Sequence, residues 1–425
     1  MLSRVAGGGE VKILLVHNFY GSTSPSGENA VVREECDLLR AGGHEVVEHF
    51  VSSDWIREGG WMRLLRTGLL APWNPRARAE VRKKILSSAP EIVHVHNVFP
   101  LLSPSIFSAA EGTASAVVTT LHNYRTVCAS AMLLRAGERC DLCVRKRSVM
   151  PALRNGCYKD SRAMTAPVAA GVALHRWLKT YDRHVDAHIA LTEFQKQQLV
   201  RGGLPESKVH VRPSSCNFGR RPLPWRERES KVVFVGRISA EKGLDSLLEA
   251  WRRWGNRAPA LEIVGGGPDF ERLQAAVGAG LSRKVSLTGR KPQAEAHALM
   301  ARAKLLVLPS IWFEGFPLVV REAFAFGVPV AASRIGPFEE LIGKPGAGRC
   351  FDAGNPDSIH KTIAEMWSKQ SDLERMGSIA FREYQARYNP EEGLAGLERI
   401  YQWAMEMRRS RWSGRTQEVA SRVTP

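Results

Sequence analysis

The chain has 425 residues, of which 44% are hydrophobic, so it is long enough to bury the cores of two domains. Its net charge of +17 indicates an acidic partner, such as a nucleotide, an anionic lipid surface or a nucleic acid. No apolar run reaches 18 residues, and residues 1–10 lack an apolar core. We therefore expect a cytoplasmic protein with neither a membrane-spanning helix nor a signal peptide.

Short apolar runs alternate with amphipathic stretches through the first half of the chain. The runs at 12–17, 45–47, 91–96, 116–121 and 187–192 have the length and composition of buried strands. Because strands that alternate with helices form parallel βαβ units, this half predicts a doubly wound α/β domain over residues 11–212. In such domains, ligands bind at the carboxyl ends of the strands.

The sequence Ser26-Gly27-Glu28-Asn29 follows the first strand and opens a helix. Gly27 and Glu28 are therefore candidates for a flexible loop that covers a ligand. The structural alternative is a helix start at which the carboxylate of Glu28 interacts favourably with the helix dipole.

His122 ends the strand at 116–121 and is expected to project from the ligand edge of the sheet. A histidine there can donate a hydrogen bond to a sugar hydroxyl while a carbonyl holds its other nitrogen. The alternative is a histidine whose bonds are satisfied within the fold. His94, His96 and Asn97 close the preceding strand, and His96 and Asn97 are candidates for the acceptor side; simple strand-end polarity is an equally open interpretation.

After His122, a span of thirty residues contains four cysteines, two of them in a CxxC pair: Cys128, Cys140, Cys143 and Cys157. Since disulfides seldom persist in the cytosol, this set predicts a structural zinc site in an insertion over residues 123–160. Unligated thiols and redox chemistry are the alternatives. Four thiolates would leave no open coordination position, so the zinc would fold the insertion and catalysis would require no cofactor.

Two stretches of the first half are candidates for contact with an anionic membrane. The insertion and its flank carry six cations: Arg145, Lys146, Arg147, Arg154, Lys159 and Arg162. Residues 55–73 interleave tryptophans, leucines and arginines, as helices that lie on a membrane do. A solvated basic loop and a helix that packs on its sheet are the alternatives. A peripheral position at the inner face of the membrane is therefore one expectation.

Residues 213–230 contain three prolines and many arginines and are predicted to link two domains. After them, strand-like runs begin at Val232, Leu261, Val285, Leu305 and Val328. They predict a second α/β domain over residues 231–388. Residues 389–409 are predicted to form a helix, and residues 410–425 a disordered basic tail.

A strand, a turn and a helix in the second domain carry the most informative motif. Glu314-Gly315-Phe316-Pro317-Leu318 follows the apolar run at 305–310, and Glu322 lies in the next helix. The unpaired N–H groups of the turn and the first helical turn suit a pyrophosphate, so the candidates for donor binding are Gly315, Phe316, Pro317, Leu318 and Val319. The carboxylates of Glu314 and Glu322 are good acceptors for hydroxyls of a sugar and a ribose. Two solvated glutamates are the alternative.

Two cations flank an earlier turn of the same domain. Arg237 and Lys242 follow the strand-like run at 231–236, where a helix is about to begin, and a guanidinium fork with an ammonium group suits a diphosphate. Ordinary surface cations are the alternative. Arg290 follows the strand at 285–289 and is a candidate for the side that holds a nucleotide base.

Together, Gly236-Arg237, Glu241-Lys242-Gly243 and the pair Glu314 and Glu322 resemble retaining GT-B glycosyltransferases with a group-1 type C-terminal domain. These are family 4-like enzymes of the bacterial polysaccharide-assembly type. The resemblance extends over residues 11–405. It implies two Rossmann-like domains that face each other across a cleft, with a C-terminal helix that crosses back to the first domain.

The resemblance also implies roles for the candidate residues. Arg237 and Lys242 would neutralise the diphosphate leaving group, Glu314 would hold the sugar and Glu322 the ribose. His122 would lie near the sugar after domain closure. No covalent nucleophile is implied, because the acceptor proton is expected to pass to the departing phosphate. The family often has two adjacent glycines where this chain has Ser26-Gly27, so the match is weaker there.

The predicted activity is retaining transfer of a sugar from a nucleotide diphosphate sugar to a hydroxyl acceptor, which a lipid could carry, in surface or extracellular polysaccharide synthesis. A nucleotide-sugar epimerase of the same fold is one alternative, and a basic protein that binds nucleic acid or anionic lipid is another. A phosphorylase would need a lysine-bound pyridoxal cofactor, and no lysine stands out for it. Paired carboxylates at strand-end turns do not suit a nonspecific binder, so no nucleic-acid partner is expected.

Overall fold

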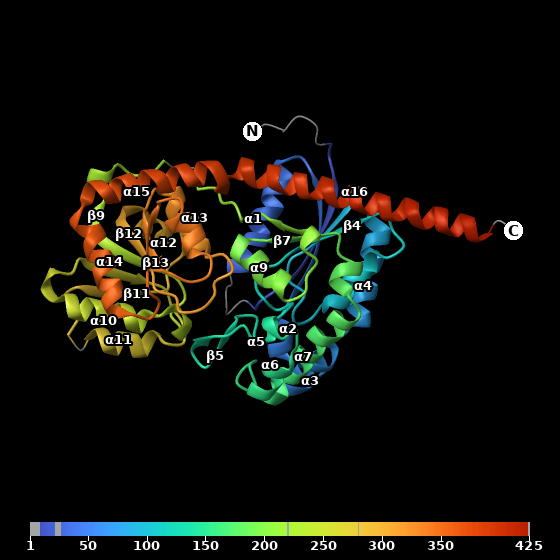
Figure 1. The fold of residues 1–425 in the computed structure, drawn as a ribbon, viewed down its shortest axis with the longest axis horizontal. Coiled ribbons are helices and arrows are strands. Elements are labelled where there is room, and N and C mark those ends of the chain that lie inside the picture. The colour runs from blue at the N-terminus through green and yellow to red at the C-terminus, as the bar shows by residue number, and fades with distance from the viewer. Residues whose placement is uncertain (1–8, 22–26, 219–220, 279, 424–425) are drawn as a thin grey trace. The chain divides into compact units, whose positions relative to one another are not determined.

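The computed structural model describes residues 9–21, 27–218, 221–278 and 280–423 (Figure 1). The chain divides into two compact units. The first unit comprises Met1–Met132, Asp141–Ser214 and Pro390–Pro425, and the second comprises Leu133–Cys140 and Ser215–Asn389. The boundary at Ser214 lies two residues beyond residue 212, the predicted end of the first domain. None of the helices among the described residues is long and apolar enough to cross a membrane.

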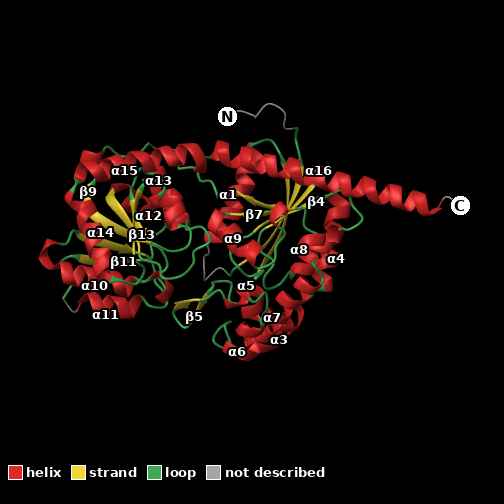
Figure 2. Ribbon diagram, viewed as in Figure 1, coloured by secondary structure: helices red, strands yellow, loops and turns green. Residues whose placement is uncertain are grey.

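The first unit is built on a six-stranded parallel sheet in the order β2-β1-β3-β4-β7-β8 (Figure 2). Its strands are β1 (Lys12–Phe19), β2 (Glu45–Ser52), β3 (Ile92–Val95), β4 (Ala116–Thr120), β7 (Ala187–Ala190) and β8 (Val209–Val211). Its helices are α1 (Gly27–Ala41), α2 (Asp54–Glu58), α3 (Gly60–Leu70), α4 (Pro75–Ser88), α5 (Leu142–Arg145), α6 (Met150–Asn155), α7 (Arg162–Trp177), α8 (Thr180–Arg183), α9 (Glu193–Arg201) and α16 (Pro390–Val423).

Helices cover both faces of this sheet, which is why its strands read as continuous apolar runs. Successive side chains of β1 enter two different cores. Ile13 and Leu15 pack with residues of α1 and α16, whereas Leu14 and Val16 pack with residues of α4 and the 3₁₀ helix Pro104–Ala110. The alternation follows from the two-residue period of a strand. The unit is therefore doubly wound, as predicted.

Helix α16 belongs to the first unit although it follows the second in sequence. Leu394, Leu397, Tyr401 and Ala404 recur at helical spacing and are buried in the same core as β1 and α1. The helix was predicted to end at residue 409, with a disordered tail after it. It continues to Val423 instead, so this prediction is wrong for residues 410–423. The segment beyond residue 409 contains one glycine and no proline before Pro425, so nothing in its sequence stops an established helix.

The second unit has a parallel sheet in the order β11-β10-β9-β12-β13-β14. Its strands are β9 (Glu229–Val235), β10 (Ala260–Val264), β11 (Val285–Gly289), β12 (Ala303–Leu308), β13 (Val330–Ser333) and β14 (Gly348–Phe351), with a separate hairpin of β5 (Leu134–Arg135) and β6 (Glu138–Arg139). Its helices are α10 (Leu244–Trp254), α11 (Phe270–Gly278), α12 (Gln293–Arg302), α13 (Leu318–Ala325), α14 (Pro356–Ser368) and α15 (Gln370–Glu383). One core joins β9, β10 and β12 to α10 and α14.

The prediction of two doubly wound α/β domains is confirmed. Residues 133–140, which contain the β5–β6 hairpin, were predicted to lie in the first domain as part of the insertion at 123–160. They belong to the second unit instead. There the guanidinium of Arg139 lies 5.9 Å from the ring centroid of Phe313. Short strands β8 and β14 extend the two sheets beyond the strands that were predicted.

Candidate functional site

In the second unit, the candidate donor residues gather where the strand order reverses. From β9 the sheet grows through β10 and β11 on one side and through β12 on the other, so β9 and β12 form the topological switch point. Both strands are parallel, and their carboxyl ends lie at the same edge of the sheet. Arg237 and Lys242 follow β9, and Glu314 follows β12. In open α/β sheets, this crevice is where ligands bind.

The Glu314 carboxylate is held by three donors that converge on one oxygen. Lys242 Nζ donates to Glu314 Oε1 at 2.6 Å, and Ser310 Oγ and Trp312 Nε1 donate to the same atom at 2.9 Å each. The side chain of Glu314 is 8% exposed and that of Lys242 is 22% exposed. The structure thus pairs two predicted residues, and the buried geometry fixes the direction of the carboxylate.

The loop after β9 is held tightly against the loop after β12. Gly243 has a φ of +68°, and a Cβ atom there would lie 2.1 Å from the carbonyl oxygen of Pro309. Only glycine therefore allows this approach, which sets Lys242 beside Glu314. Ile311 N–H donates to the Glu241 carbonyl at 3.0 Å and joins the two loops further. Arg237 is exposed, and its role stays a prediction.

Helix α13 begins at Leu318, and Pro317 precedes it without a side-chain cap. Gly315, Phe316 and Pro317 are buried in the turn, whereas Leu318 and Val319 are partly exposed. The prediction treated the whole segment 315–319 as a source of N–H donors, but Pro317 has none. Phosphate binding by this turn therefore stays a prediction that depends on its other residues.

Glu322 lies on α13 and faces α12. Its Oε2 atom is 3.5 Å from Nε2 of His297, and each of the two side chains is 14% exposed. The ring of His297 lies against Phe218 at 4.5 Å and against Phe326 at 5.6 Å. Glu322 is thus a half-buried carboxylate with a titratable neighbour.

Arg290 lines a surface hollow of about 480 Å³ at the carboxyl ends of β10 and β11. Gly266, Gly267, Phe270 and Gly289 form other parts of its wall. The hollow lies along the sheet edge that carries Lys242 and Glu314. The predicted role of Arg290 beside a nucleotide base stays a prediction.

The first unit has its own switch point, between β1 and β3. Asn97 joins the ends of these strands: its Nδ2 donates to the carbonyl of Asn18 at 3.0 Å, and Asn18 N–H donates to the carbonyl of Asn97 at 2.9 Å. Asn97 also bonds both backbone groups of Phe99. Its amide therefore holds the turn together, which is a structural role.

A buried network of polar side chains runs from this switch point to His122. Nε2 of His122 and Nδ1 of His96 share a hydrogen bond of 2.9 Å. His96 Nε2 lies 3.2 Å from Oε1 of Glu35 on α1, and Arg212 Nη1 donates to Oε2 of Glu35 at 2.6 Å. Burial alone would raise the pKa of Glu35, but the Arg212 guanidinium and His96 hold it well below its usual range. Burial and His96 lower the pKa of His122, so it is neutral near pH 7.

Glu35, His94 and His96 form the one group of potential metal ligands found among the described residues. Both nitrogens of His94 are already in hydrogen bonds, Nδ1 with the Tyr401 hydroxyl at 2.7 Å and Nε2 with the Thr120 hydroxyl at 2.8 Å. The Arg212 guanidinium already balances the charge of Glu35. The group is therefore best described as a hydrogen-bond network that connects α1, β3, β4 and α16.

Buried histidines make the stability fall on acidification, and Glu28, whose pKa burial raises to about 8, offsets part of this fall. His17 and His94 have pKa values of about 3 in the folded protein, chiefly because of burial, against 6.5 for an unperturbed histidine. As the pH falls below 6.5, the unfolded chain binds protons that the folded protein does not bind, so the stability present above pH 6.5 is lost on acidification. Glu35 remains charged in this range. Each of these histidines lowers the free energy of unfolding by up to about 1.4 kcal/mol for each pH unit below 6.5.

We therefore expect the free energy of unfolding in urea to fall between pH 7 and pH 5. The fall should be smaller for His17→Gln, because that variant has one buried histidine fewer. The same slope in the variant and in the wild type would contradict this account of the acid sensitivity.

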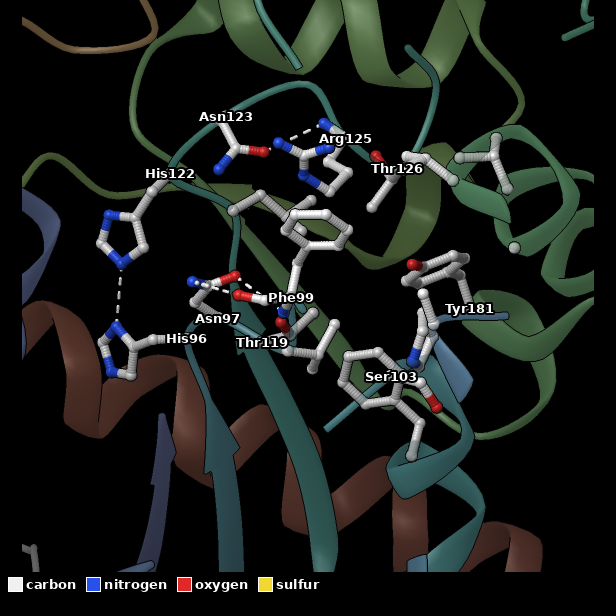
Figure 3. A pocket seen from close by; sticks show the side chains of 18 residues that line it. His96, Asn97, Phe99, Ser103, Thr119, His122, Asn123, Arg125, Thr126 and Tyr181 are labelled. Atoms are coloured by element: carbon white, nitrogen blue, oxygen red, sulfur yellow. Dashed lines mark hydrogen bonds between the residues drawn. The ribbon is translucent and has the colours of Figure 1, made fainter. Parts of the chain in front are cut away.

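A pocket of about 70 Å³ lies beside His122 (Figure 3). Phe99, Phe107, Tyr181 and Val172 give it largely apolar walls, and His96, Asn97 and Arg125 also line it. The Arg125 guanidinium lies 4.0 Å from the ring centroid of Phe99 and donates to the Ala129 carbonyl. The pocket therefore presents two histidines, of which His122 is neutral, and one held cation among largely apolar walls.

Helix α1 begins at Gly27, Glu28 is its second residue, and Ser26 lies outside the described residues. Burial raises the pKa of Glu28 to about 8, and the nearby Arg125 guanidinium opposes this rise. The carboxyl group can therefore donate a hydrogen bond near neutral pH.

Two of the four cysteines of the insertion, Cys143 and Cys157, pack in one hydrophobic cluster. Cys128 and Cys143 are buried, Cys140 and Cys157 are half-buried, and no three of these sulfurs come within 4.8 Å of one another in the part of the chain that is described. Cys140 belongs to the hairpin of the second unit, where its N–H donates to the Leu133 carbonyl. The structural zinc stays a prediction without support from this arrangement.

Several residues of these networks were not predicted: Glu35, His17, Trp312 and His297. A signal existed for Glu35, which stands between Val32, Cys36 and Leu39 on the apolar side of α1. A carboxylate in that position must find a buried partner. No local pattern marks His297, because its contact with Glu322 joins two helices.

Two family models match the chain. The model described as glycosyl transferases group 1 matches residues 217–383, and the model described as glycosyltransferase family 4 matches residues 25–217. An exopolysaccharide phosphotransferase of Streptomyces coelicolor is 32% identical over 202 residues, which are 46% of this chain and 21% of that protein. A phosphatidyl-myo-inositol mannosyltransferase of Mycolicibacterium smegmatis is 24% identical over 399 residues, 90% of this chain and 92% of that protein.

The fold also agrees with a solved structure. HepE of Anabaena, in complex with UDP, superposes with a TM-score of 0.62 at 16% identity, over 94% of this chain and 100% of that chain. The chain spans between 21% and 52% of the length of the first five curated relatives. The two matched models together run through both units, so the chain belongs to the group 1 glycosyl transferases, with a family 4 N-terminal part and the GT-B fold.

Proposed function

We propose that the protein is a retaining glycosyltransferase that moves a sugar from a nucleotide diphosphate sugar to a hydroxyl acceptor in the synthesis of a cell-surface or extracellular polysaccharide. The observation that carries the proposal is the Glu314 carboxylate at the switch point of the second unit, with Lys242, Ser310 and Trp312 on one oxygen. The family match and the UDP in the related HepE structure support a nucleotide-sugar donor.

The proposed chemistry of the second unit is electrostatic. As the bond between the sugar and the diphosphate breaks, negative charge grows on the phosphate oxygens, and Lys242 and Arg237 would stabilise it. Glu314, fixed by its three donors, would accept hydrogen bonds from sugar hydroxyls, and Glu322 would do so for the ribose. Interactions that strengthen as charge develops lower the barrier, whereas uniform binding does not.

The first unit would hold the acceptor. His122 is neutral, and its bond to His96 fixes the orientation of the imidazole, so Nδ1 can bond a sugar hydroxyl. Glu35 and Arg212 hold His96 from behind. No side chain is assigned as a covalent nucleophile, and the acceptor proton would pass to the departing phosphate.

The first test is thermal unfolding with uridine, guanosine and adenosine diphosphate sugars, each beside its free diphosphate. A donor at a hundred times its dissociation constant should stabilise the folded state by about 2.7 kcal/mol. We expect one nucleotide family to raise the midpoint, and the sugar conjugate to raise it further than the diphosphate. No shift with any nucleotide, together with a shift by RNA, would remove the basis of the proposal.

A further inference from the structure

The exposed large hydrophobic side chains of the first unit are not scattered. Six of the ten such residues in the described part of the chain come from α2 and α3: Trp55, Trp61, Met62, Leu64, Leu65 and Leu69. Trp61, Leu65 and Leu69 recur every four residues and are 73%, 56% and 72% exposed. A helix of a globular protein normally turns its apolar stripe toward the core. Helix α3 instead leaves such a stripe uncovered.

Helix α7 lies beside α3 (Figure 1). The two helices are in contact, because a Cβ atom at Gly68 of α3 would lie 3.9 Å from Cγ of Pro167 of α7. Apart from Arg162 in the first turn, the exposed positions of α7 recur every three or four residues and are apolar: Ala163, Ala166, Ala170, Ala173 and Trp177. Trp177 is 78% exposed. These residues together with Trp61, Met62, Leu65 and Leu69 are called the α3–α7 surface.

The charges around the α3–α7 surface are mostly positive, with Glu58 and Asp160 as the acidic exceptions. Residues 59–79 contain four arginines and no acidic residue, and residues 145–179 contain eight lysines and arginines against one aspartate. Arg66, Arg162 and Lys179 are exposed at the ends or flanks of the two helices. An apolar face with a cationic border is complementary to anionic headgroups above acyl chains. A cytosolic protein partner would not require an excess of positive charge in this border.

We propose that the α3–α7 surface docks on an anionic lipid bilayer, with Trp61, Leu65, Leu69 and Trp177 in the headgroup layer and the arginines on lipid phosphates. The proposal does not depend on the transferase function. It has a consequence for that function, because the opposite face of α7 supplies Val168, Gly171 and Val172 to the pocket beside His122. Docking would hold the pocket close to the bilayer, where a lipid-borne acceptor is found.

The test is sedimentation of the full chain with vesicles at about 0.1 M salt. One set of vesicles is phosphatidylcholine alone, and the other contains about 30 mol% phosphatidylglycerol. We expect binding at least about tenfold tighter on the anionic vesicles, and at least about tenfold weaker binding of Trp61→Ser/Leu65→Gln/Leu69→Gln to them. Arg66→Ser should weaken only the binding to anionic vesicles.

Matched controls come from the same chain. Leu86→Gln changes a leucine that is 61% exposed on α4, away from the surface, and should bind as the wild type does. Arg283→Ser removes an exposed cation of the second unit and should also have no effect. The thermal midpoint of each variant, with and without UDP, reports whether fold and donor binding are intact.

Wild-type protein that stays in the supernatant with both kinds of vesicle would overturn the proposal, and so would a triple variant that binds as tightly as the wild type. Light scattering after size exclusion adds a third outcome. If the wild type is a dimer and the triple variant is a monomer, the surface is an interface between two copies of the chain, and the membrane-docking proposal is wrong. If nucleotides still raise the thermal midpoint in any of these cases, the proposed function is not affected.

Discussion

Glu314→Gln is expected to lower kcat/KM by about 10²- to 10³-fold, which corresponds to about 3–4 kcal/mol of transition-state stabilisation. Glutamine has nearly the same size, but its amide is uncharged, and Lys242 Nζ loses the carboxylate that it contacts at 2.6 Å. Of the three donors on Oε1, only Ser310 has a hydroxyl that can turn to accept instead. The variant should therefore lose both the direction and the charge of the sugar-binding group.

The measurement is a steady-state assay with the donor found by thermal unfolding. Glu374→Gln is the matched control, because Glu374 lies exposed on α15 of the same unit. We expect the midpoint shift with free UDP or GDP to survive in Glu314→Gln, while the additional shift given by the sugar conjugate disappears. Activity within about threefold of wild type would show that Glu314 is not part of the donor site.

Glu35→Gln is expected to lower the free energy of unfolding by about 3–5 kcal/mol, because Arg212 remains buried without its carboxylate. Arg212 Nη1 contacts Glu35 Oε2 at 2.6 Å, and the two side chains are 6% and 3% exposed. The same change removes the acceptor that faces His94 and His96. Urea titration monitored by circular dichroism measures the loss.

The pair of Arg40 and Glu48 supplies the control, since Arg40 is also on α1 and the contact of 2.5 Å is exposed. Glu48→Gln should cost less than about 1 kcal/mol. The double variant Glu35→Gln/Arg212→Met removes both charges and should recover much of the stability that Glu35→Gln loses. Equal losses in Glu35→Gln and Glu48→Gln would mean that the buried network contributes little.

Both candidate sites depend on pairs of residues far apart in the sequence. Lys242 and Glu314 are 72 residues apart, and Arg212 and Glu35 are 177 apart. Each member of the donor pair could be predicted, because the turn after an apolar strand marks it locally. The bond between Lys242 and Glu314 could not be predicted in this way. It depends on the strand order, which makes β9 and β12 neighbours.

His122 and His96 illustrate the same limit. Each was predicted from its position at the end of a strand, but their shared hydrogen bond and the connection to Glu35 follow from the pairing of β3 with β4 and from the packing of α1. The four cysteines are a different case. Their spacing predicted a zinc site, which stays a prediction, but spacing alone cannot reveal that Cys140 belongs to the second unit.

The sequence by itself determined the two α/β domains, the places of most strands and the two carboxylates of the donor motif, because hydrophobic period, glycine turns and strand-end polarity are local properties. It also contained the apolar stripe of residues 55–73, but a helix that packs on its sheet and a helix with an uncovered face have the same period. Only the tertiary structure decided which side chains of α3 and α7 remain exposed and which polar groups meet in the interior. Burial and hydrogen-bond partners are set by contacts between distant segments, and these contacts exist only after the chain has folded.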